Sequence, residues 1–141
     1  MQMNTNQAKN KTIQSRDQEY AVDAYNRVKT VKSLSETVRD RYGSMAHKLP
    51  ILIRTAGPAQ ALAYIEARGK PEHKRLLNDL ALTLDKQSRE TLAEAAMNAE
   101  LSEYIYLTQQ ALSALLWYKR FAQSVLDVQP GGKGDDNDES R

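Results

Sequence analysis

Apolar and small residues recur at helical spacing along much of this chain. The clearest run lies in the N-terminal third. Its members are Ala21, Ala24, Val28, Val31, Ser35, Val38 and Tyr42. An α-helix has about 3.6 residues per turn, so this spacing places all of them on one face of a helix. The pattern predicts a helix that packs along another long helix.

Residues that make tight turns are scarce. The 141 residues include 6 Gly and 4 Pro, too few for the many turns of a β-sandwich or barrel. One short apolar run, residues 49–53, could pass for a strand, but Pro50 argues against a central strand and no second strand pattern pairs with it. The length fits one domain. The sequence therefore predicts an all-α, single-domain bundle of about six helices, with long first and last helices.

Capping residues predict where these helices begin and end. Ser15 and Gln18 match a capping box, so the first helix is expected over residues 15–42, with Gly43 as a left-handed C-cap. Further on, Gly57-Pro58 and Gly69-Lys70-Pro71 each place Gly after one helix and Pro in the first turn of the next. The remaining helices are expected over residues 45–54, 59–68, 71–84, 89–97 and 101–128.

The two ends of the chain differ in composition from the helical domain at 15–128. Residues 1–14 are mostly Asn, Gln, Lys and Thr, and residues 129–141 contain four Asp or Glu. Both ends are predicted to be disordered, because they contain too few apolar side chains to form a core. The N-terminus has no apolar core of a signal peptide and no stretch approaches 18 apolar residues, so the expected location is the cytoplasm.

Few residues suited to catalysis are present. The chain has no Cys and two His, His47 and His73, and neither has a His or Glu three or four residues away. Glu90 and Glu94 share a helical face, but their neighbours are typical of a helix surface. There is no glycine-rich phosphate loop. The sequence predicts no catalytic residue, no metal site and no cofactor; a metal-dependent nuclease using Glu or His is the enzyme alternative.

Positive charge is concentrated in the N-terminal part. Residues 1–56 carry ten Lys or Arg and five Asp or Glu. Lys29, Lys32 and Arg39 share a stripe of the expected first helix with Glu36, and other cations follow closely. The predicted nucleic-acid-binding ridge comprises Lys29, Lys32, Arg39, Arg41, Lys48 and Arg54. Such a ridge would contact a phosphate backbone without reading bases. The alternative is an ordinary solvated helix face with local ion pairs.

Two segments resemble a known family. Residues 42–65 read YGSMAHKLPILIRTAGPAQALAYI, and residues 106–122 read YLTQQALSALLWYKRFA. The first combines a Tyr-Gly pair, Lys-Leu-Pro, an apolar stretch with Arg-Thr, and Gln-Ala-Leu-Ala. Both resemble the Cmr small-subunit family, the small α-helical subunits of type III-B CRISPR effector complexes. The resemblance covers about residues 15–127.

The resemblance implies a function in antiviral defence. Members of the family are non-catalytic subunits whose copies stack head to tail as a minor filament. The implied partners are the backbone subunit that holds the guide RNA, the large signature subunit, further copies of the same chain, and the guide–target RNA region, mainly the target strand. Guide–target pairing would carry sequence specificity. The alternative is a protein–protein spacer in the same assembly, without direct contact to nucleic acid.

Overall fold

The computed structural model describes residues 14–131, in which the chain forms six helices and no strand. The helices are α2 (Arg16–Lys32), α3 (Glu36–Ala56), α4 (Pro58–Arg68), α5 (Pro71–Thr83), α6 (Arg89–Asn98) and α7 (Leu101–Ser124). The predicted all-α class is therefore confirmed. No helix among them is long and apolar enough to cross a membrane. The expected disorder at residues 1–14 and 129–141 falls almost entirely outside the described range.

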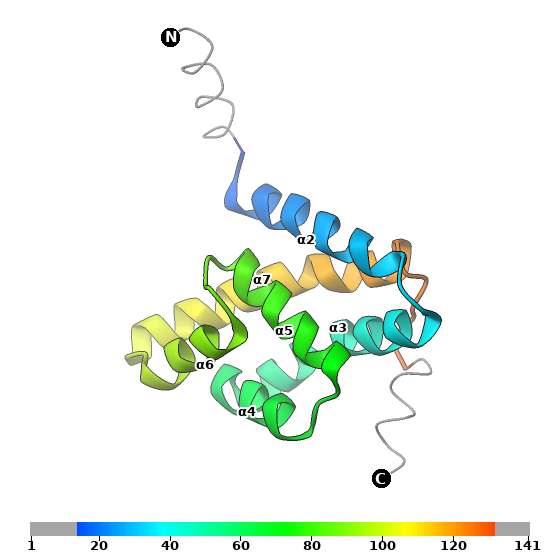
Figure 1. The fold of residues 1–141 in the computed structure, drawn as a ribbon. Coiled ribbons are helices and arrows are strands. Elements are labelled where there is room, and N and C mark those ends of the chain that lie inside the picture. The colour runs from blue at the N-terminus through cyan, green and yellow to red at the C-terminus, as the bar shows by residue number, and fades with distance from the viewer. Residues whose placement is uncertain (1–13, 132–141) are drawn as a thin grey trace, which may run out of the picture.

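Helix α7 lies between α2 and α3 in the middle of the molecule (Figure 1). Helices α4, α5 and α6 pack against one another, and α4 and α5 also pack against α3. The apolar stripe of α2 faces the core as its spacing predicts, with Ala24, Val28 and Val31 inaccessible to solvent. Leu115 and Tyr118 present the buried face of α7 to the same core.

The expected first helix is two helices, and this is a correction to its predicted bounds. Helix α2 ends at Lys32, and Ser35 caps α3 by accepting a hydrogen bond from the Val38 amide at 3.3 Å. Ser33 donates to the Thr30 carbonyl at 2.9 Å in the last turn of α2. Serine hydroxyls that bond to the backbone compete with helix continuation. The capping box at Ser15 is confirmed.

Gly43 is not a helix C-cap, because α3 continues through it and through Pro50. Gly43 is buried under the C-terminal segment instead, and a Cβ atom there would lie 2.7 Å from the Cβ of Val128. The His47 ring secures the same segment by donating from Nε2 to the Val128 carbonyl at 2.8 Å. Glycine is thus needed for the close approach of two chain segments rather than for a positive φ.

The helix boundaries predicted from the later Gly and Pro residues are confirmed. Gly57, with φ of 86°, ends α3 and precedes Pro58, the first residue of α4, and Pro71 begins α5. Ser88 caps α6 by accepting a hydrogen bond from the Thr91 amide at 3.2 Å. The last helix is shorter than expected. It ends at Ser124 rather than near residue 128, because the chain turns back there to cover α3.

A buried polar cluster joins four helices. The Tyr42 hydroxyl on α3 donates to the Asp79 carboxylate on α5 at 2.6 Å. Thr83 on α5 donates to the Asp23 carboxylate on α2 at 2.5 Å, and its oxygen lies 2.7 Å from the Tyr118 hydroxyl on α7. Buried polar groups are costly unless they are paired, so these bonds favour one arrangement of the four helices.

Candidate nucleic-acid interface

The break between α2 and α3 separates the cations of the predicted ridge. Lys29 and Lys32 are exposed in the last turns of α2. Positive side chains stabilise this end of a helix, because it carries a partial negative charge. The Lys29 ammonium also lies 5.2 Å from the centre of the Tyr25 ring. The other four cations belong to α3. The six residues therefore do not follow one continuous helical stripe.

Arg39 is turned back onto α2. Its Nη1 donates to the Leu34 carbonyl at 2.8 Å and lies 3.4 Å from the Lys32 carbonyl. These oxygens belong to the C-terminal turn of α2 and to the linker after it, which have no partners within the helix. Arg39 thus stabilises the corner between the two helices and keeps a cation beside Lys32.

Arg41 and Lys48 face the opposite side of α3. Their separation of seven residues is close to two helical turns. The Arg41 Nη1 lies 3.5 Å from the Glu72 carboxylate on α5, in an ion pair whose two side chains are 28% and 15% exposed. Its charge is therefore partly balanced inside the protein. Arg54, in the last turn of α3, is exposed.

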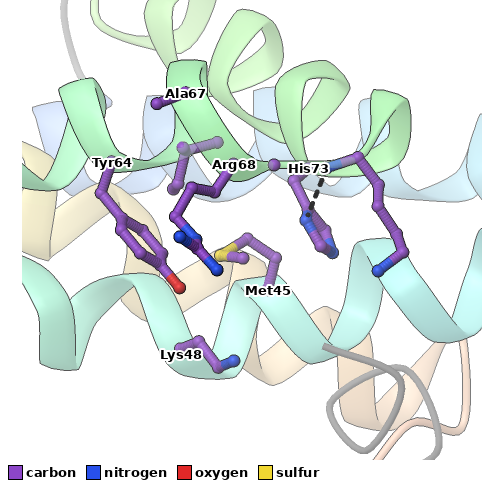
Figure 2. A pocket seen from close by; sticks show the side chains of 9 residues that line it. Met45, Lys48, Tyr64, Ala67, Arg68 and His73 are labelled. Carbon is purple, nitrogen blue, oxygen red and sulfur yellow. Dashed lines mark hydrogen bonds between the residues drawn. The ribbon is translucent and has the colours of Figure 1, made fainter. Parts of the chain in front are cut away.

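Lys48 lies in a cavity of about 360 Å³ between α3, α4 and the start of α5. We call it the α3–α5 pocket. Its main lining side chains are Met45, Lys48, Tyr64, Arg68, Lys70 and His73. Figure 2 shows the Tyr64 ring and the Arg68 guanidinium directed from α4 toward the part of α3 that carries Lys48. No Asp or Glu is among the described lining residues.

Arg68 and Lys70 are cations that the sequence alone did not single out. Arg68 ends α4, and Lys70 precedes Pro71 at the start of α5. They come together with Lys48 because the Gly69 turn reverses the chain over α3. The buried His73 ring accepts a hydrogen bond from the Lys70 amide through Nδ1 at 3.1 Å, which fixes this turn (Figure 2). The Gly69-Lys70-Pro71 sequence predicts a turn between two helices, but it does not predict that the turn forms part of a pocket.

The buried polar cluster is the other place where titratable groups meet. Burial raises the pKa of the Asp79 carboxyl, although the Tyr42 hydroxyl and two Arg residues oppose this shift. Burial also raises the pKa of the Tyr42 and Tyr118 hydroxyls. The Tyr42 hydroxyl bonds to the Asp79 carboxylate, and the Tyr118 hydroxyl bonds to Thr83 and to the Asp79 carbonyl, so these groups join helices to one another. Within residues 14–131 no three His, Cys, Asp or Glu side chains are placed to hold a metal ion.

Helix α7 carries an apolar strip on its outer side. Leu101 is 75% exposed, Ile105 49% and Leu116 42%. Their spacing of four and eleven residues places them on one face of the helix. Met97, at the end of α6, is 65% exposed near the start of the strip. We call Met97, Leu101, Ile105 and Leu116 the outer strip. Apolar surface gathered in this way is typical of a protein–protein contact.

These features define a small all-helical protein with a cationic pocket and an apolar strip on different helices. The sequence profile of a family described as CRISPR-associated protein (Cas_Cmr5) matches residues 16–125. The CRISPR system Cmr subunit Cmr5 of Thermus thermophilus is 44% identical over 115 residues, which cover 82% of this chain and 99% of that protein.

A solved structure agrees with this match. The crystal structure of a CRISPR-associated Cmr5 family protein from Thermus thermophilus superposes with a TM-score of 0.76 at 43% identity, over 82% of this chain and all of that one. The chain therefore belongs to the Cmr5 family, the Cmr small subunits of type III-B CRISPR systems. The resemblance noted at residues 42–65 and 106–122 is confirmed, since both segments lie inside the matched range.

Proposed function

We propose that this protein is a non-catalytic small subunit of a type III-B Cmr ribonucleoprotein. Its copies stack as a minor filament beside the backbone that holds the guide RNA. Basic residues of α2 and α3 line the channel for the target RNA, and the large signature subunit is a further partner. Membership of the Cmr5 family is the observation that carries this proposal.

Two structural features support the parts of this proposal. The exposed cations Lys32 and Arg54, together with Lys48 in its pocket, give α2 and α3 positive charge that attracts a polyanion. The outer strip provides apolar surface for a neighbouring copy. Head-to-tail stacking joins two different surfaces of each copy, and such an interface can be repeated without closing.

Salt-dependent binding of single-stranded RNA tests the nucleic-acid contact. The full chain should bind more weakly as salt rises, because binding releases counterions from the RNA. The double variant Lys32→Gln/Arg54→Gln removes two exposed cations, so the fold should be retained. We expect its slope of log affinity against log salt to fall by about 1.4, at about 0.7 per phosphate contact on a single strand.

The matched control is Lys119→Gln/Arg120→Gln, which removes the same two residue types from exposed positions of α7. It should leave the slope close to that of the wild type. The spacer alternative predicts that the wild-type chain is not retained on immobilised RNA even at low salt. That result for the isolated full chain would overturn the proposed RNA contact.

A further inference from the structure

The α3–α5 pocket gathers three cations, and two carboxylates near it pair with cations that do not line the pocket. Glu66, on α4 before Arg68, accepts a hydrogen bond from Arg89 of α6 at 2.6 Å. Glu72, just after the pocket turn, pairs with Arg41 at 3.5 Å. These two carboxylates are therefore committed to other cations beside the pocket. The start of α5 adds the partial positive charge of a helix N-terminus.

We propose that the α3–α5 pocket binds the phosphodiester backbone of single-stranded RNA, with Lys48, Arg68 and Lys70 on the phosphates and Tyr64 against a base. This inference rests on the proposed function, and it assigns the contact to a site that includes only one residue of the predicted ridge. It adds Arg68, Lys70 and Tyr64 to the RNA-binding residues.

The chemistry of each side chain fits this ligand. A guanidinium presents paired N–H donors that match two oxygens of one phosphate, and a lysine ammonium adds a flexible point charge. The three cations come from three successive parts of the fold, so they surround the cavity rather than lie along a flat surface. The volume of about 360 Å³ lies in the range of small-ligand sites.

Tyr64 favours RNA over an acidic protein segment as the occupant. Its side chain is 47% exposed at the pocket, beside the Arg68 guanidinium (Figure 2). An aromatic ring next to a groove of cations is the arrangement with which proteins bind single strands, because every base has a face that stacks. An acidic peptide would use the cations but would gain little from the ring.

The test compares Arg68→Gln/Lys70→Gln with the wild-type full chain, using a labelled oligouridylate and fluorescence anisotropy at several salt concentrations. Both substitutions keep the backbone amide that bonds to His73. We expect binding at low salt to weaken about tenfold, and the salt slope to fall by about 1.4 because two phosphate contacts are lost. The variant Lys119→Gln/Arg120→Gln is again the control, since α7 contributes no residue to the pocket.

Tyr64 is tested separately. Tyr64→Ala should weaken binding about fivefold or more with an unchanged salt slope, since stacking of a base on the ring contributes to affinity but releases no ions. Tyr64→Phe should bind as the wild type does, because the ring remains. Equal weakening by Ala and Phe would show that the hydroxyl matters rather than the ring, and would overturn the assignment of Tyr64 to a base.

Failure of the pocket differs from failure of the proposed function. If the wild type binds RNA and Lys32→Gln/Arg54→Gln weakens it, while Arg68→Gln/Lys70→Gln does not, the pocket assignment is overturned and the proposed function stands. If the wild type does not bind RNA, the pocket assignment and the RNA contact of the proposed function both fall, and the spacer alternative is favoured.

The alternative ligand of the pocket is the acidic segment at residues 132–141 of the same chain. A truncated chain that ends at Gly131 tests this alternative. With the segment absent, the pocket variant should still weaken RNA binding about tenfold relative to the truncated wild-type chain. Loss of that difference would show that the pocket acts through the acidic segment and would overturn the RNA assignment.

Discussion

Asp79 shows how one partly buried carboxyl can contribute to the pH response of the fold. Its environment combines burial, which favours the neutral acid, with a hydrogen bond from Tyr42, which favours the carboxylate. Burial has the larger effect, so the pKa is raised from the usual value of 3.8. In the folded state the group therefore holds its proton to a higher pH than in the unfolded state.

We expect the free energy of unfolding to fall as the pH rises from about 3.8 through the raised pKa of Asp79. In this window the folded state binds more protons than the unfolded state, which gives stability a negative slope with pH. Asp79→Asn cannot ionise, yet its amide oxygen still accepts the Tyr42 bond. Urea unfolding of both proteins from pH 4 to pH 7 should show the wild type losing stability relative to the variant.

If the free energy of unfolding of the wild type relative to the variant stays constant or increases with pH, then Tyr42 and the nearby Arg residues outweigh burial. Tyr42→Phe provides the matched comparison, because it removes the one hydroxyl bonded to this carboxylate. In that background the decline with pH should be steeper, since an interaction that favours the charged form is gone.

At the scale of elements, Gly43 has a role opposite to the one its sequence position indicates. Glycine in a helix interior costs about 1 kcal/mol relative to alanine, so Gly43→Ala would stabilise an isolated α3. In the folded chain the new methyl group would lie 2.7 to 2.9 Å from three carbon atoms of Val128. We expect a net loss of about 1–3 kcal/mol, as in an overpacked core, measured by urea unfolding.

The variant Val128→Ala serves as the partner in a double-mutant cycle. It removes two of the three carbon atoms in conflict, so Gly43→Ala should cost less in that background. If the stability losses of the two single variants add up to the loss of the double variant, the strain does not lie in the contact between α3 and the C-terminal segment.

The sequence predicted most helices and some of their ends, and the exceptions have physical causes. The spacing of apolar and small residues continues across the break, because Val31 in α2, Ser35 in the linker and Val38 in α3 are separated by steps of four and three. Periodicity therefore cannot reveal this break, whereas the serine caps could have. The α3–α5 pocket was not predictable in this way. Lys48 and Arg68 are twenty residues apart, and only the packing of α4 over α3 brings them together.

At the scale of the molecule, its two candidate surfaces use different forces. The pocket acts through charge and should weaken with salt. The outer strip acts through apolar burial, which salt does not screen. Under the proposed function the subunit binds both an RNA strand and a neighbouring copy, and this division would allow either contact to be altered without the other. High salt should accordingly release RNA while leaving self-association in place.

Self-association of the full chain tests the outer strip. Burying a Leu or Ile side chain is worth about 1.5–3 kcal/mol, so Leu101→Gln/Ile105→Gln should weaken association at least about tenfold in sedimentation equilibrium. Both side chains are at least 49% exposed, so the fold should be retained. The control Val22→Gln/Leu82→Gln changes two other exposed apolar residues, on α2 and α5. Equal weakening by both variants would show that general hydrophobicity drives association, and the outer strip would then have no special part in stacking.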